Sequence, residues 1–307
     1  MEIKHKVAII GATSKTAEAM IRLFTAETDW DILLCTASTE YNFPKEVTVL
    51  PIDYEHPKHI RELFLEHMPT VIINTAAMTN VDACEIDKQK SWNINVTWVE
   101  QLSRTAAIVD AHLIHFSSDY VFDGKSGPYT ESDMPNPISY YGKSKLASEN
   151  ACKISYAKTT IIRTNVVYGY SSHNKIDFVQ WIINKCELKI PFGVVNDQLS
   201  NPTLTDDIAL GIKKIIEKKR TGLYHFGGLD FINRIDFAKK IAEIYHLDDS
   251  LIQPITTESL NQKAKRPLQS GLISLKASTD LGVKFCGIES GLITLRHQMH
   301  VFSQYSR

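Results

Sequence analysis

The chain has 307 residues, enough for one large domain or two small ones around a substantial buried core. Its 43% hydrophobic and 22% charged residues are ordinary for a globular protein. Because 34 lysine and arginine residues balance 35 aspartate and glutamate residues, we expect no general attraction to nucleic acid or to an anionic membrane surface.

The N-terminus and the cysteines favour a cytoplasmic protein. The first residues form no secretory apolar segment, and the chain has no apolar run of about 18 residues. The five cysteines are widely spread, which is typical of reduced thiols. Two histidine pairs, His56 with His59 and His297 with His300, lack the H-E-x-x-H pattern or a cysteine partner, so we expect no metal.

Short apolar runs alternate with amphipathic stretches through the first half of the chain, a pattern typical of β-α-β units and a parallel sheet. In chain order we predict a strand at Lys6–Ile10, a helix at Thr13–Ala26, a strand at Asp31–Cys35, an apolar run at Val47–Leu50, a helix around Lys58–His67, an apolar run at Val71–Thr75, a helix at Lys88–Ile108, a strand at His112–Phe116, a helix from Pro137 to about Tyr156, and a strand at Thr159–Arg163. Such continuous apolar strands fit a sheet covered by helices on both faces.

The alternation becomes irregular after Arg163. Segments such as Phe178–Cys186, Leu223–Phe226 and Asn233–Tyr245 indicate a smaller lobe interwoven with returning strands. The expected fold is therefore α/β, a Rossmann-type doubly wound parallel sheet with a smaller interwoven α/β substrate lobe. We predict a dinucleotide-binding domain over residues 1–168 with a returning segment at about 195–225. The substrate-binding lobe is predicted over about 169–194 and 226–307.

Gly11 to Ala17 connect a predicted strand to a predicted helix, where a dinucleotide-binding fold holds its pyrophosphate. Glycines are expected at positions 11, 14 and 17, but only Gly11 is one. Ala17 is small enough for close packing, whereas Ser14 places a Cβ where the backbone normally approaches the phosphates. The Ser14 hydroxyl is a candidate phosphate ligand, and a plain strand–helix turn is an equal alternative.

The choice between NAD and NADP is usually made at the end of the second strand, by an acid for the ribose hydroxyl or a cation for the 2′-phosphate. Residues 35–39 offer hydroxyls and neither charge. The lack of a carboxylate favours NADP(H), and NAD(H) remains open.

Tyr141 and Lys145 lie four residues apart on a predicted helix, so they share one face. A tyrosine with an ordinary pKa near ~10 must fall toward ~7 to exchange protons at working pH, which requires roughly 4 kcal/mol. A cation about 4 Å away supplies about that amount at an effective dielectric constant near 20. We therefore interpret Tyr141 as a proton donor and Lys145 as its activator.

Ser118 supports this interpretation through its position. It follows a predicted strand, and a hydroxyl at the carboxyl end of a parallel strand points into the crevice where ligands bind. Ser118 is therefore expected to hold a carbonyl oxygen while Tyr141 protonates it. The alternative is that Ser118 is a turn residue.

Motifs along nearly the whole chain resemble the dTDP-4-dehydrorhamnose reductase family of extended short-chain dehydrogenases. They comprise the run from Asn74 to Thr79, Val81-Asp82 with Glu85, the run from Ser118 to Gly124, the Tyr141/Lys145 helix, Arg163-Thr164, Asp197-Gln198 with Pro202-Thr203, and Arg266-Pro267 with Ser270 and Leu272. The resemblance implies hydride transfer from NAD(P)H to the C4 ketone of a nucleotide-linked 6-deoxyhexose. It also suggests a homodimer.

The resemblance further implies roles for individual residues. The implied cofactor residues are Gly11, Ser14, Lys15 and Thr16 at the phosphates, Asp53 and Tyr54 near the adenine, Ala77, Met78 and Thr79 along the cofactor, and Tyr141 and Lys145. Ser118 and Asp119 would contact the sugar, and Arg266 would anchor the nucleotide or diphosphate unless it forms a structural ion pair. Val166 stands near the place where the family usually puts an aromatic residue against the substrate.

Two other functions remain as alternatives. A nucleotide-sugar dehydratase or epimerase shares the fold, but dehydratases commonly carry a glutamate where this chain has Tyr120. A non-catalytic regulatory or binding subunit would explain the altered glycine turn, although it would not explain why Ser118, Tyr141 and Lys145 are all present.

Overall fold

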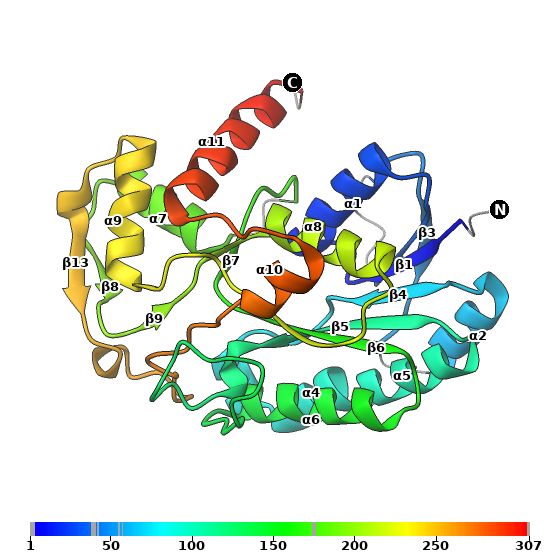
Figure 1. The fold of residues 1–307 in the computed structure, drawn as a ribbon. Coiled ribbons are helices and arrows are strands. Elements are labelled where there is room, and N and C mark those ends of the chain that lie inside the picture. Colours follow the sequence, from blue (N-terminus) through cyan, green and yellow to red (C-terminus); the bar gives the residue numbers. More distant parts are fainter. Residues whose placement is uncertain are drawn as a thin grey trace.

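The computed structural model describes residues 4–37, 41, 43–54, 56, 58–173 and 176–305. Seven parallel strands form its central sheet, in the order β11-β6-β5-β4-β1-β2-β3 (Figure 1). The strands are β1 (Lys6–Ile10), β2 (Asp31–Thr36), β3 (Thr48–Pro51), β4 (Val71–Asn74), β5 (His112–Ser118), β6 (Thr159–Thr164) and β11 (Gly222–Phe226). The direction of winding reverses between β1 and β4, the point where such sheets bind ligands. The expected doubly wound α/β class is confirmed.

Helices cover both faces of the sheet because its strands are apolar on both sides (Figure 1). Val7 and Ile9 of β1 belong to one buried core, and Ala8 and Ile10 belong to the other. The first core includes α1 (Lys15–Glu27), α8 (Thr205–Glu217) and α10 (Leu275–Leu281), and the second includes α2 (Lys58–His67), α5 (Trp98–Ile108) and α6 (Tyr140–Ile154). Two short helices, α3 (Val81–Ile86) and α4 (Lys88–Trp92), precede α5.

The helix predicted over Lys88–Ile108 is interrupted. A π-helical turn over Asn93–Thr97 separates α4 from α5, and it presents the side chain of Asn95 to the loop after β4. Helical periodicity in the sequence does not reveal such a turn, because the widening depends on the contact that Asn95 makes.

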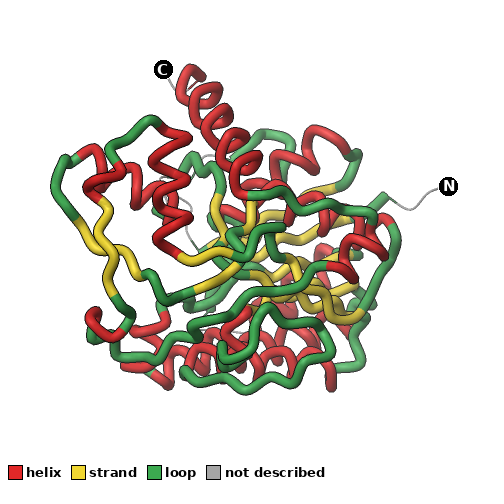
Figure 2. The backbone as a smooth tube through the Cα atoms, turned by 60° about the vertical axis from the view of Figure 1, so that its left-hand side comes forward, coloured by secondary structure: helices red, strands yellow, loops and turns green. Residues whose placement is uncertain are grey.

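The remaining elements form a smaller group to one side of the sheet (Figure 2). Its elements are α7 (Phe178–Glu187), α9 (Arg234–Tyr245), α11 (Ile288–Tyr305), and the strand pairs β7 (Val167–Tyr168) with β10 (Thr203–Leu204), β9 (Leu199–Ser200) with β12 (Ile232–Asn233), and β8 (Phe192–Val195) with β13 (Ile252–Ile255). This lobe has its own apolar core. By contrast, α10 lies within the range predicted for the lobe and packs on the main sheet. The predicted domain boundaries stay a prediction.

Within the described part of the chain, no helix has the length and apolar character needed to cross a membrane.

Candidate active site

Gly11 makes the turn after β1 and needs to be glycine. Its φ is +78°, and a Cβ there would lie 2.7 Å from Thr75 Oγ1 and 2.9 Å from the Ala76 backbone nitrogen. The loop after β4 therefore closes against this turn. Helix α1 begins shortly after this turn. Its N-terminal N–H groups therefore lie at the carboxyl edge of the sheet.

Ser14 is the N-cap of α1. Its Oγ accepts a hydrogen bond from the Ala17 N–H at 3.1 Å and lies 2.9 Å from Thr75 Oγ1. The hydroxyl predicted as a phosphate ligand is thus already used to cap the helix. Lys15 and Thr16 follow it in the first turn of α1.

The ammonium group of Lys15 turns toward the lobe. Its Nζ lies 2.8 Å from Asp177 Oδ2 and donates to the Gly169 carbonyl oxygen at 2.9 Å. Lys15 was predicted to line the cofactor phosphates; in the structure its side-chain charge is paired with Asp177, and a role of its backbone at the phosphates stays a prediction. The reason for this pairing is long-range: the fold brings Asp177, the N-cap of α7, to the Lys15 ammonium at the start of α1.

Asp53 and Tyr54 follow β3, at the same edge of the sheet as the Gly11 turn. The Asp53 carboxylate is exposed and lies 2.7 Å from His56 Nδ1. The Tyr54 ring packs edge-on against Trp98, with 4.8 Å between the ring centroids. Of the segment examined for cofactor selectivity, Ser38 and Thr39 lie outside the described residues.

Ala77, Met78 and Thr79 continue from β4 across the crevice. Asn95 holds this loop, since its Oδ1 accepts from the Met78 N–H at 2.8 Å and its Nδ2 donates to the Met78 carbonyl at 3.1 Å. The same Nδ2 lies 3.0 Å from Ser144 Oγ on α6. Sequence reasoning missed Asn95; its signal is a polar residue on the buried face of the predicted helix.

Ser118 ends β5, and Tyr141 and Lys145 lie in the first turns of α6, where the Tyr141 phenol forms a hydrogen bond with Ser118. All three are buried, with exposed fractions of 7%, 8% and 3%. Ser139 caps α6 by accepting from the Gly142 N–H at 3.2 Å. The cap fixes where α6 begins and therefore where the Tyr141 ring lies.

Burial has the largest influence on the pKa values of Tyr141 and Lys145. Burial raises the pKa of Tyr141 above its ordinary value, although a hydrogen bond with Ser118 acts in the opposite direction. Burial also lowers the pKa of Lys145 to about 8, opposed by the charge of Glu149. The Lys145 Nζ donates to the Phe116 carbonyl at 2.6 Å. Desolvation is the largest influence on the Tyr141 pKa in the protein alone, and the fall of that pKa in a working enzyme stays a prediction.

Glu149 forms a buried ion pair one helical turn beyond Lys145. It accepts from Arg163 Nε and from Arg163 Nη2, both at 2.8 Å, and from Ser117 Oγ at 2.6 Å. The pair joins α6 to β5 and β6 behind the site. Sequence reasoning included Arg163 in a motif and did not identify its partner.

Asp119 follows Ser118 and is buried. Its two carboxylate oxygens accept from Ser118 Oγ at 2.9 Å and from Ser270 Oγ at 2.6 Å. Burial raises the pKa of Asp119 to about 6, although both serine hydroxyls oppose the shift. Tyr120 lies next, with its ring edge-on to Tyr141 and the centroids 5.5 Å apart.

Arg266 forms an ion pair with Asp82, at 2.8 Å between Nη2 and Oδ2. Asp82 also accepts from the Ala264 N–H at 2.9 Å. Burial opposes the ionisation of Asp82, but these hydrogen bonds and the Arg266 charge hold its pKa below the ordinary value. The structural ion pair weighed for Arg266 is therefore present. Val166 packs against the core of the lobe with φ of +40°, an uncommon conformation for a β-branched residue.

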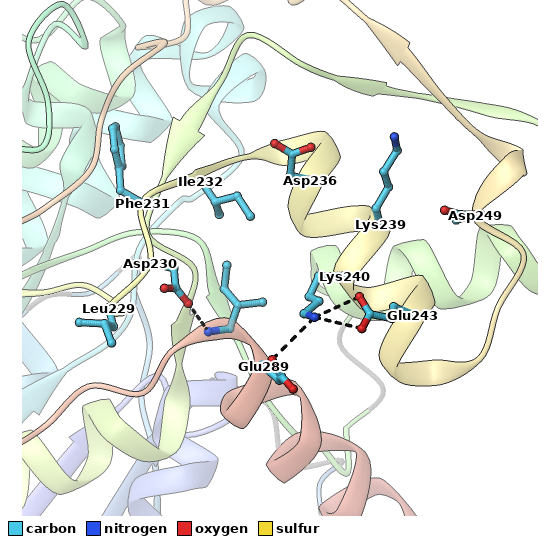
Figure 3. Close-up of a pocket in the computed structure, with 11 residues that line it drawn as sticks. Leu229, Asp230, Phe231, Ile232, Asp236, Lys239, Lys240, Glu243, Asp249 and Glu289 are labelled. Atoms are coloured by element: carbon cyan, nitrogen blue, oxygen red, sulfur yellow. Dashed lines mark hydrogen bonds and ion pairs between the residues drawn. The ribbon is translucent and has the colours of Figure 1, made fainter.

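A surface cavity of about 720 Å³ lies elsewhere on the lobe, between α9 and the start of α11 (Figure 3). It is lined largely by charged side chains, and Lys240 there pairs with Glu243 and Glu289. None of the predicted site residues lines this cavity. Among the residues that the structure describes, no cluster of three or more histidine, cysteine, aspartate or glutamate side chains could hold a metal ion.

Comparisons with known proteins identify the family and the fold. A family model described as the RmlD substrate binding domain matches residues 5–300. The dTDP-4-dehydrorhamnose reductase of Aggregatibacter actinomycetemcomitans is 35% identical over 228 residues, which are 70% of this chain and 76% of that protein. Methionine adenosyltransferase 2 subunit beta of Rattus norvegicus is 30% identical over 285 residues, which are 91% of this chain and 83% of that protein.

A solved structure with a similar fold carries a cofactor. It is the crystal structure of dTDP-4-dehydrorhamnose reductase from Bacillus anthracis in complex with NADP, with a TM-score of 0.83 and 27% identity. The match covers 96% of this chain and 100% of that one.

Proposed function

Because the chain belongs to the RmlD substrate binding domain family of NAD(P)-dependent oxidoreductases, we propose that it reduces a keto group on a nucleotide-linked deoxysugar. The observation that carries the proposal is the buried group of Ser118, Tyr141 and Lys145 at the carboxyl edge of the sheet. A phenol and an ammonium group buried together next to a serine hydroxyl suit proton transfer to a carbonyl oxygen.

The residues present fit a nicotinamide cofactor. The Gly11 turn lets the loop after β4 approach too closely for a Cβ, and α1 begins shortly after this turn at the carboxyl edge of the sheet. The N–H groups of Lys15 and Thr16 belong to the first turn of that helix and suit phosphate oxygens. When bound, the nicotinamide supplies the hydride.

The roles of the chain's own residues follow from their contacts. Ser118 Oγ lies at the end of β5, and its hydroxyl proton, which Asp119 Oδ1 accepts in the protein alone, would turn to the substrate's carbonyl oxygen. Tyr141 gives its phenolic proton to that oxygen as the carbonyl carbon is reduced, and Lys145 stabilises the phenolate that remains. Burial keeps Tyr141 protonated before the reaction, which suits a proton donor.

A cofactor titration tests this function. Purified protein is titrated with NADPH and with NADH by nicotinamide fluorescence, and turnover of a dTDP-4-keto-6-deoxy sugar is measured beside a Tyr141→Phe variant. We expect binding in both proteins and a loss of at least about 100-fold in turnover in Tyr141→Phe, since only the proton-donating hydroxyl group is removed. Undiminished turnover in the variant would exclude Tyr141 as the donor.

A regulatory or binding subunit is the second candidate function. The observation that favours it is the 30% identity to methionine adenosyltransferase 2 subunit beta over 91% of this chain, together with Ser14 in the phosphate turn. The same titration separates the two functions. Wild-type protein that binds neither nucleotide, or that turns over no keto sugar, would favour the non-catalytic subunit.

A further inference from the structure

Arg234 lies beside the candidate active site, and its guanidinium forms no ion pair with another described residue. It begins α9, and its backbone N–H donates to the Gln198 carbonyl at 3.0 Å. Its guanidinium lies over the ring of Phe178, with 4.9 Å between Cζ and the ring centroid. Phe178 itself is stacked on Phe237 of the same lobe, with the centroids 5.5 Å apart. The aromatic layer therefore holds the guanidinium by its flat face.

No carboxylate of the described chain pairs with this guanidinium. The ionisable groups that influence it are Asp119, Tyr120 and Arg266; burial lowers the pKa of Arg234, and Tyr120 and Asp119 oppose the shift. The oxygens of Asp119 are occupied by two serine hydroxyls, and Arg266 is paired with Asp82. Arg234 thus keeps its in-plane N–H donors for another acceptor.

A ligand whose oxygens accept hydrogen bonds from Arg234 must also extend to Ser118 and Tyr141. Tyr120 is in edge-on ring contact with Tyr141, and the Arg234 guanidinium is close enough to Tyr120 and Asp119 to influence the pKa of each. A sugar linked to a diphosphate presents anionic oxygens on the side away from its keto carbon. A stacked guanidinium matches such oxygens because it donates two parallel hydrogen bonds.

We propose that Arg234 binds the diphosphate of a nucleoside-diphosphate ligand at the edge of the active site. The proposal rests on the proposed function and deepens it, since it names the residue that selects diphosphate-linked sugars over free sugars. Arg266, which sequence reasoning named as the anchor, then acts as a neighbouring cation whose charge is largely balanced by Asp82.

Calorimetry with dTDP, UDP and thymidine tests the assignment without requiring turnover. We expect Arg234→Met to weaken binding of the diphosphate that the wild type prefers by about 10- to 100-fold, and to change thymidine binding by less than about threefold. Arg234→Lys keeps the positive charge but loses the two parallel N–H donors, so its affinity for the diphosphate should be intermediate. Lys239→Met is the matched control, because it removes an exposed cation from the same helix, in the cavity of Figure 3.

Three results would overturn the proposal. The first is a wild type that binds neither diphosphate, and the second is an Arg234→Met variant that binds its diphosphate within about twofold of the wild type. The third is a loss of thymidine binding in Arg234→Met as large as its loss of diphosphate binding, which would indicate damage to the lobe. Circular dichroism and thermal melting check the fold of each variant. The two proposals can also fail separately. If diphosphate binding depends on Arg234 but the wild type turns over no keto sugar, this inference holds and the proposed reductase function does not.

In an active reductase, the same variant gives a kinetic readout. Because the diphosphate does not react, its contact is made equally before and during the reaction. Arg234→Met should therefore raise KM for the nucleotide sugar by about the same factor as the dissociation constant of dTDP, with kcat within about threefold of the wild type. A fall in kcat alone would contradict the assignment.

Discussion

Burial controls the protonation of the catalytic residues one by one. Tyr141 and Lys145 are both buried, and desolvation favours the neutral form of each. In the proposed reaction the consequences are opposite, because a neutral tyrosine can donate its proton whereas a neutral lysine has lost the charge that would stabilise a phenolate. The pKa of Lys145, lowered to about 8, therefore sets an upper limit on the working pH.

We expect kcat/KM for reduction to fall about tenfold per pH unit above about pH 8. Below that pH Lys145 is charged, and above it the proton is lost progressively, since kcat/KM reports the pKa values of the free enzyme. The measurement is a pH profile of kcat/KM from 6 to 10. Lys145→Arg should be slower and should lack this limb, because arginine stays charged. A wild-type profile that is flat to about pH 9.5 would contradict the assignment.

At the scale of elements, the start of α6 is positioned by a close approach to the turn that follows β5. A Cβ on Gly142 would collide with the Tyr120 carbonyl oxygen, which is a backbone atom and cannot rotate away. Glycine at this position lets α6 approach the turn closely enough for Tyr141 to reach Ser118.

Gly142→Ala should move α6 and separate these side chains. We expect a loss of about 1–3 kcal/mol in the free energy of unfolding, as for other overpacked sites, and at least about a tenfold fall in kcat. Lys143→Ala, on the exposed side of the same helix, is the control and should change neither. Urea denaturation and steady-state kinetics make the comparison; unchanged values in Gly142→Ala would show that α6 can shift without consequence.

Most elements of the main sheet could be predicted from the sequence, because local patterns decide them. The apolar run at Lys6–Ile10, the glycine after it and the four-residue spacing of Tyr141 and Lys145 are all local signals. The π-helical turn around Asn95 could not be predicted, since it serves a contact with Met78 that exists only in the folded chain.

At the scale of the whole molecule, the contacts that shape the site join residues far apart in the sequence. Asp82 pairs with Arg266, and Lys15 pairs with Asp177. No sequence pattern links such partners, so sequence reasoning assigned Lys15 to the cofactor and left the state of Arg266 open. The raised pKa of Tyr141 could not be predicted for the same reason, because its burial is produced by the assembled fold.

The pair between Lys15 and Asp177 should connect the stability of the lobe to that of the phosphate turn. We expect Lys15→Met and Asp177→Asn each to lower the free energy of unfolding by about 1–3 kcal/mol, and the double variant to lose less than the sum by at least about 0.5 kcal/mol. The exposed pair of Lys158 and Asp110 is the control, with a coupling below about 0.5 kcal/mol. Strict additivity at Lys15 and Asp177 would show that the two charges do not interact in solution.

The pairing of β11 with β6 has a consequence for synthesis of the chain on the ribosome. β6 ends at Thr164, but the strand that covers its edge ends only at Phe226, after several elements of the lobe have been made. Until then the nascent sheet has an open, apolar edge, and the face that α8 later covers is exposed. Fragments that end between these two strands should therefore aggregate, and a soluble nucleotide-binding domain cannot be obtained by truncating the chain after β6.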